Sequence, residues 1–180
     1  GIDYGSGEGP RVRIAGDGAT LLRSALDSDG GGEQGTLTGA YEMPIAGGAF
    51  RVNGRLFQDL YDFDETAIVT VPDSHQERNH YGEDTKESEL GLRYSRPLTA
   101  RANLELIGLF QTGDKAIGSD LDAPGDLEHF SLDRQTSESI VRSVFSYRLR
   151  PNLSFEVGGE GALNKLESRT RYIQNGAPVL

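Results

Sequence analysis

The sequence predicts an all-β fold, an antiparallel up-and-down meander of long strands that forms part of a transmembrane outer-membrane β-barrel. Three observations lead to this prediction. Apolar and polar residues alternate with period two over long stretches, as in strands and not helices. Tight turns alternate with long polar segments along the chain. A proline marks each tight turn, at Pro44, Pro97 and Pro151, so the pattern repeats about every 54 residues.

The composition narrows the classes of function. The 180 residues carry 28 acidic and 18 basic side chains, for a formal net charge of -10. A chain this acidic repels phosphate, so a nucleic-acid-binding role is excluded. Cysteine is absent, which excludes disulfides and thiolate chemistry. No apolar run approaches the roughly 18 residues of a transmembrane helix.

The first element is a glycine-rich segment, residues 1–32, which we expect to be mostly irregular. Within it, Arg11–Ile14 fits either a short strand or irregular chain. The chain begins at Gly1 and not at Met, and no signal peptide is recognisable. We therefore expect a removed presequence or a piece of a longer chain.

Six strands follow in order. The clearest places Phe50, Val52 and Leu56 on one face and Arg51 and Arg55 on the other. The later strands repeat this alternation, and prolines or glycines separate them. The expected strands are residues 34–43, 48–62, 85–95, 101–112, 137–149 and 153–166. Long polar loops are expected at residues 64–84 and 113–135.

Strand length favours a membrane location. A strand of about 12 residues tilted near 40° climbs roughly 30 Å, enough to cross an outer membrane. Tyr41, Tyr94 and Tyr147 each precede a tight turn, as expected of an interfacial aromatic belt. The cell outer membrane is therefore the expected location and its lipid an expected partner. The charged face would line a wet lumen, with Arg51, Arg55, Glu89, Arg93, Glu105, Arg142, Arg148 and Glu156.

Two polar clusters in the expected loops are candidate ligand contacts. His75, Glu77 and His80 combine imidazole and carboxylate groups, which suit a transition metal. Asp120, Asp122 and Asp126 offer oxygen ligands, but their spacing does not match a calcium loop. The alternative for both clusters is a solvated polar loop, and we expect no resident metal or cofactor. No nucleophile constellation is present, so the chain is expected not to be an enzyme.

Two hairpins carry a family resemblance. The first is Glu89-Leu-Gly-Leu-Arg-Tyr-Ser-Arg-Pro-Leu-Thr followed by Asn103-Leu-Glu-Leu-Ile-Gly-Leu-Phe-Gln, and the second begins at Val144-Phe-Ser-Tyr-Arg-Leu-Arg-Pro. They resemble barrel hairpins of TonB-dependent outer-membrane receptors, and the similarity covers about residues 35–175. The resemblance implies an importer for a siderophore, metal chelate, vitamin or sugar. It also implies a plug domain, the TonB energy-transducing complex and a small-molecule ligand as partners.

The chain departs from that family in three ways. It has no TonB box, residues 1–32 are too short for a plug and fit only its end, and Asn175–Leu180 lacks a terminal aromatic strand. Six strands also cannot close a barrel, which needs at least eight. The expected interpretation is the first barrel strands of a larger receptor. The alternatives are a soluble or surface-exposed all-β binding module, and a complete small outer-membrane barrel with extra strands at Arg11–Ile14 and Thr66–Val71.

Overall fold

The computed structural model describes residues 2–8, 11–16, 21–71 and 73–179. These residues form one antiparallel sheet, and no helix occurs among them. The strands are β1 (Ile2–Glu8), β2 (Arg11–Gly16), β3 (Leu21–Ile45), β4 (Gly48–Val71), β5 (His75–Thr99), β6 (Ala102–Ala123), β7 (Asp126–Arg150), β8 (Leu153–Gln174) and β9 (Ala177–Val179). The predicted all-β fold is confirmed.

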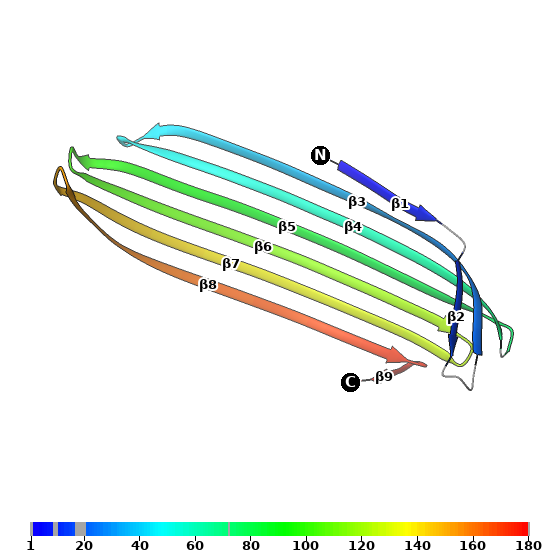
Figure 1. The fold of residues 1–180 in the computed structure, drawn as a ribbon. Helices are drawn as coiled ribbons and strands as arrows, with labels where there is room; N and C mark the ends of the chain where they lie inside the picture. The colour runs from blue at the N-terminus through cyan, green and yellow to red at the C-terminus, as the bar shows by residue number, and fades with distance from the viewer. Residues whose placement is uncertain (1, 9–10, 17–20, 72, 180) are drawn as a thin grey trace.

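The sheet is an up-and-down meander. Its order is β1-β3-β4-β5-β6-β7-β8-β9, and β2 also pairs with β3 (Figure 1). β3 to β8 have 22 to 25 residues each and every one pairs with its neighbour in sequence. In the described part of the chain the sheet is open, because β8 has β7 on one side and only three residue pairs with β9 on the other. The antiparallel meander is therefore confirmed, and the closed transmembrane barrel stays a prediction.

The predicted long loops at 64–84 and 113–135 are wrong. β4 and β5 are paired up to Val69↔His75, and β6 and β7 up to Ala123↔Asp126. Aspartate, glycine and histidine are frequent in these segments, and their low strand propensity favoured loops. Each expected strand is real but longer than predicted, because unbroken backbone pairing carries it through the polar residues. Both ends of the sheet consequently have short connections.

The glycine-rich segment is also more regular than expected. Leu21–Gly32 is the first half of β3, and β1 and β2 pair along the same edge of it. Arg11–Gly16 is a strand, which was one of the two alternatives that the sequence left open for Arg11–Ile14. Thr66–Val71, in contrast, continues β4 and is not a separate strand. The interpretation of residues 1–32 as the end of a plug stays a prediction.

Tight turns set the register of the hairpins. Ala46 and Gly47 both have positive φ (48° and 76°), as do Asn175 and Gly176 (51° and 78°). Two consecutive positive values are the mark of the type I′ turn, whose twist suits antiparallel strands. We call the end of the sheet with the turns at 46–47, 100–101 and 151–152 proximal, and the opposite end distal; Figure 1 shows the proximal turns at the left.

The two faces of the sheet follow from the register, because directly paired residues share a face. Face A carries the row Gly54, Leu90, Phe110, Ser139 and Leu163, and face B carries the row Arg55, Glu89, Gln111, Glu138 and Asn164. On β6, the face B side chains from Asn103 to Leu121 are all half-buried, whereas those of face A are mostly exposed. The sheet therefore shields face B more than face A.

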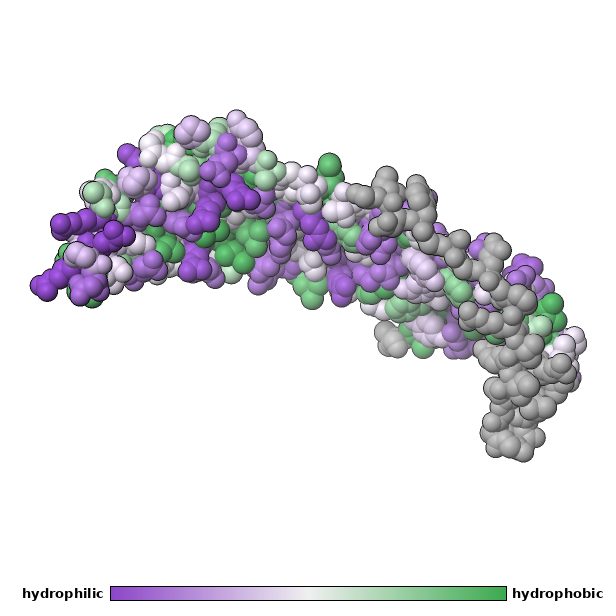
Figure 2. All heavy atoms as spheres, turned by 45° about the horizontal axis from the view of Figure 1, so that its top comes forward, coloured by the Kyte–Doolittle hydropathy of each residue, from purple (hydrophilic) through white to green (hydrophobic). Residues whose placement is uncertain are grey.

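Such a single layer has almost no enclosed core. Among the described side chains the buried apolar residues are Ala67, Val69 and Ala102. The space-filling view in Figure 2 shows an elongated, curved molecule with hydrophobic patches between hydrophilic side chains. Most large apolar side chains of the described strands therefore stay at least partly accessible.

Candidate functional site

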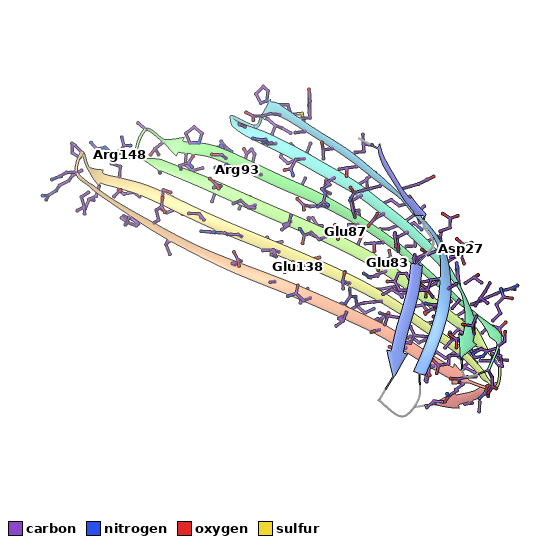
Figure 3. The ribbon with its side chains drawn as sticks, turned by 45° about the vertical axis from the view of Figure 1, so that its right-hand side comes forward. Asp27, Glu83, Glu87, Arg93, Glu138 and Arg148 are labelled. Carbon is purple, nitrogen blue, oxygen red and sulfur yellow. The ribbon has the colours of Figure 1, made fainter. Side chains whose placement is uncertain are left out.

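Face B gathers the charged residues that the sequence assigned to one side of the strands. All eight of the predicted lumen residues lie on this face, on β4 to β8. Figure 3 labels Arg93, Glu87, Glu138 and Arg148 along the length of the sheet. Arg93 Nη2 lies 2.9 Å from Glu105 Oε2, and Arg51 is paired with Arg93 in the register. The shared face follows from period two alone; whether it faces a lumen stays a prediction.

The middle of face B is hollowed. Arg55, Glu89, Gln111, Glu138 and Asn164 form one row across five strands, and the hollow over them has a volume of about 550 Å³. Arg55 Nη2 lies 3.3 Å from Glu87 Oε2, and Gln111 Nε2 donates to Glu89 Oε2 at 2.9 Å. Glu87, Glu89 and Glu138 outnumber Arg55, so this wall is acidic and rich in hydrogen-bonding groups.

The distal part of face B carries an aromatic row that the sequence analysis missed. Phe63, Tyr81, Phe130 and Tyr172 are in register across β4, β5, β7 and β8, with Ser119 of β6 between Tyr81 and Phe130. Tyr61, two residues before Phe63, adds a fifth ring whose centroid is 6.1 Å from that of Tyr81. The period-two position of these rings was the available signal, but residues 64–84 and 113–135 were expected to be loops. We call these five residues the aromatic row.

Next to the aromatic row lies a hydrogen-bonded carboxylate, Glu83. It accepts hydrogen bonds from Lys115 Nζ at 2.5 Å, from the Tyr81 hydroxyl at 2.8 Å and from Thr85 Oγ1 at 3.2 Å. The bond from Lys115, followed by that from Tyr81, lowers the pKa of Glu83 below its usual value. Glu83 is therefore an internally paired anion.

The candidate metal ligands do not come together. His75 and Glu77 lie on face B of β5, with His75 Nε2 3.1 Å from Glu77 Oε1, whereas His80 lies on face A. Asp120 and Asp122 lie on face A of β6, and Asp126 pairs with Ala123 on face B. These residues belong to strands and not to loops. In the described part of the chain, no group of three or more such ligands could hold a metal ion.

Face A instead carries a row of alternating carboxylates and imidazoles. Asp64, His80, Asp120 and His129 are paired in succession across β4 to β7. His80 Nδ1 lies 2.9 Å from Asp64 Oδ1, and His129 Nδ1 lies 2.6 Å from Asp120 Oδ1. The hydrogen bond to Asp64 raises the pKa of His80. A turn at Pro124 and Gly125 gives the Asp120–His129 pairing, so this dipeptide was the signal in the sequence.

The proximal part of face A is a continuous exposed apolar surface. Its large side chains are between 39% and 78% exposed; they are Leu37, Tyr41, Leu56, Leu90, Leu106, Phe110, Val141, Phe155, Val157 and Leu163. We call this surface the apolar band. The three tyrosines predicted as a belt, Tyr41, Tyr94 and Tyr147, all lie on face A at the proximal end. An apolar surface this extensive is unusual for a protein in water.

The fold thus defines a class: a single-layer antiparallel meander with an apolar band on one face and a polar wall on the other. No family model matches the chain, and no curated protein is similar to it. One solved structure with some likeness is described as a pore forming protein, with 6% identity, a TM-score of 0.16 and coverage of 94% of this chain and 100% of that one.

A second likeness is to a double mutant of the Serratia marcescens hemophore receptor HasR in complex with its hemophore HasA and heme. The identity is 10% and the TM-score 0.18, with 96% of this chain and 37% of that chain covered. The chain thus spans little more than a third of that receptor's length. With TM-scores this low, neither likeness carries an argument about fold or function. The described residues contain no helix that is long and apolar enough to span a membrane.

Proposed function

We propose that this chain forms part of a transmembrane outer-membrane β-barrel, and that this barrel belongs to a TonB-dependent importer. The observation that carries the proposal is the apolar band, because a single sheet in water would leave ten large apolar side chains uncovered. Lipid chains would cover these side chains and remove their apolar surface from water, which is favourable. The polar wall of face B would then face an aqueous lumen, as in barrels whose strands alternate apolar and polar residues.

The dimensions of the apolar band fit this assignment. On β6 it runs from Ala102 to Phe110, roughly 26 Å of strand at about 3.3 Å per residue. A tilt near 40° reduces this to a height of roughly 20 Å, a little less than the apolar band of about 25 Å of outer-membrane barrels. Beyond Phe110 face A becomes polar, so the distal half would project into water.

The importer assignment rests on the resemblance of the two hairpins to TonB-dependent receptors and on the hollow, hydrogen-bonding wall of face B. In this proposal the transported molecule passes along face B, and Arg55, Glu87 and Glu138 contact it or the plug. The chain would contribute binding and no bond chemistry.

Single-cysteine labelling tests the membrane assignment, since the native chain has no cysteine. Spin labels would be placed at Leu90→Cys and Leu106→Cys on face A and at Glu89→Cys and Glu105→Cys on face B, in the full chain reconstituted in phospholipid vesicles. We expect oxygen accessibility at the first two sites and accessibility to a water-soluble nickel chelate at the other two. Equal access of the nickel chelate to all four sites, with a protein soluble without detergent, would overturn the proposal.

Transport itself is tested separately. In the producing bacterium, uptake of radiolabelled vitamin B12, a ferric siderophore and maltohexaose would be compared with and without the gene, and with and without TonB. We expect one uptake activity to need both. Uptake that is unchanged by loss of the gene, for all three probes, would remove the importer assignment and leave the membrane assignment intact.

A further inference from the structure

The polarity of face A changes along the length of the sheet. In the proximal half this face carries the apolar band, whereas in the distal half the aromatic row lies on face B, together with Ile117, Leu121 and Leu132. At the same distal level face A carries Asp62, Asp64, His80, Asp120 and His129. The distal aromatic rings therefore cannot continue the lipid-facing surface, and they line the same side as the hollow.

The aromatic row forms a broad and open surface. It crosses five strands from β4 to β8, about 19 Å at a strand spacing of about 4.8 Å. Tyr61 is 42% exposed, and the other four rings are half-buried. The described strands form one layer, so no second sheet packs on these rings.

Glycines of β3 widen this surface. A Cβ atom at Gly30 would lie 3.0 Å from Phe63 Cδ2, and one at Gly32 would lie 3.5 Å from Tyr61 Cδ2. The rings of Phe63 and Tyr61 thus lean over the backbone of β3, where a side chain would displace them. Gly30 and Gly32, which have no side chains, thus leave room for these two rings at the β3 side of the aromatic row.

The charge around the rings selects against anionic ligands. On face B within one row of the rings, the carboxylates of Asp59, Glu65, Glu83 and Glu128 outnumber the cations Lys115 and Arg134, and Lys115 is engaged by Glu83, so an anionic ligand is repelled. Glu83 accepts three hydrogen bonds, and Glu128 accepts them from Tyr172 and from Gln174 Nε2 at 3.4 Å. Lys115 neutralises Glu83, whereas the groups that donate to Glu128 are neutral and leave its charge in place. The surface therefore favours neutral over anionic ligands.

We propose that the aromatic row binds a neutral carbohydrate, with sugar rings lying against Tyr81, Phe130 and Tyr172. The inference names the substrate class of the importer proposed above and rests on it. Pyranose rings present apolar C–H faces, which the negative faces of aromatic rings attract. Their hydroxyl groups at the ring edge match the amides and carboxylates of Asn79, Gln174 and Glu128 in the adjacent row.

Binding of maltohexaose, cellohexaose and mannohexaose to the full chain in vesicles would test the proposal, with hexagalacturonate as the anionic probe. We expect at least one neutral probe to bind with a Kd below the millimolar range and hexagalacturonate to bind at least tenfold more weakly. Saturation-transfer NMR on the unmodified chain should place the sugar protons next to tyrosine and phenylalanine rings. No binding of any neutral probe, tighter binding of hexagalacturonate, or transfer to aliphatic protons only would each overturn the proposal.

Matched variants locate the site. Tyr81→Ala and Phe130→Ala should each weaken binding about tenfold, whereas Tyr81→Phe and Phe130→Tyr should change the Kd less than threefold. Tyr41→Ala on face A is the control and should leave the Kd unchanged. Equal Kd values for the alanine variants and the native chain would place the sugar elsewhere. Lipid access of a label at Leu90→Cys in the same vesicles keeps the membrane assignment separate from this result.

Discussion

The proximal and distal halves of β4 to β8 belong to the same strands, yet their A faces differ: the first carries the apolar band and the second is mostly polar. On β6, face A carries Leu106 and Phe110 in the proximal half and Asp114, Asp120 and Asp122 in the distal half, whereas face B is partly apolar in both halves, at Ile107, Leu109, Ile117 and Leu121. Strand alternation fixes the face of each residue, so the change of face A from apolar to polar is encoded in the sequence after residue 110. One strand can therefore carry two different distributions of apolar side chains in succession.

The largest expected effect comes from a charge in the apolar band. Leu106→Arg in vesicles should lower the free energy of unfolding by about 2–4 kcal/mol, because in the proposed barrel an arginine at this position would lie in the lipid layer and lose its hydration. Ala116→Arg, on the same face of the same strand in the distal half, should change it by less than about 0.5 kcal/mol. Urea unfolding followed by tyrosine fluorescence measures both. If both variants lowered the free energy of unfolding equally, the proximal and distal halves of face A would not differ in their tolerance of a charge.

Backbone packing should also separate the halves. A Cβ atom at Gly48, in the proximal half, would lie 2.5 Å from the Ser95 carbonyl oxygen and 2.9 Å from Tyr94 Cε2, so Gly48→Ala should cost about 1–3 kcal/mol. Gly118 in the distal half has no atom within 4 Å of the same position, and Gly118→Ala should be neutral or stabilise by up to about 1 kcal/mol. Urea midpoints give the comparison. A stabilising Gly48→Ala would show that the proximal strands can separate freely.

A smaller effect should come from the Glu83–Lys115 pair of the distal half. Because the folded-state pKa of Glu83 is lowered, its contribution to stability is present above the unfolded pKa near 4.5 and is lost as the pH falls through the folded pKa. Lys115→Met should cost about 1 kcal/mol or less at pH 7 and flatten the loss of stability in acid. Urea unfolding at pH 7, 5 and 3 tests this. If the free energy of unfolding depends on pH in the same way in Lys115→Met, Lys115 does not lower the pKa of Glu83.

The smallest effect concerns His80 on face A. Its pKa is raised by Asp64, so its contribution to stability is complete below about pH 6.5 and is lost as the pH rises through the folded-state value. Hydrogen exchange of the distal β4–β5 amides, corrected for the intrinsic rate, should be about twofold faster at pH 8 than at pH 6, as expected for an exposed pair. Asp64→Asn should abolish this difference, while amides near Gly47 show none in either protein. A pH effect that survives in Asp64→Asn would exclude His80 as its source.

Much of the fold could be predicted from the sequence because it depends on period two. The face of each residue from Arg51 to Glu156 follows from alternation within a strand, even where the ends of that strand are unknown. The distal half could not be predicted in the same way. There, the aspartates, histidines and glycines disfavour strands individually, and only pairing with a neighbouring strand compensates for them.

Pairings across strands were beyond sequence reasoning for a related reason. Asp120 meets His129, and Ser119 meets Phe130, only when the turn at Pro124 and Gly125 has fixed the register of β6 and β7; Tyr81 joins this row through the turn at 100–101, which fixes the register of β5 and β6. A loop of some twenty residues, as expected at 113–135, would have allowed any register. The candidate site is consequently a product of turn geometry more than of the local residue pattern.

The meander also makes the molecule effectively one-dimensional. Among the described strands, β4 to β8 contact only the strands directly before and after them in the chain, and β3 contacts β4 on one side and β1 and β2 on the other. In such a ladder, stability is a sum of terms for each strand and each neighbouring pair, as in repeat proteins. Strands can then pair one after another, each new strand adding to the edge of the strand before it. A defect in one hairpin would stop the pairing at that hairpin and leave the strands that are already paired intact.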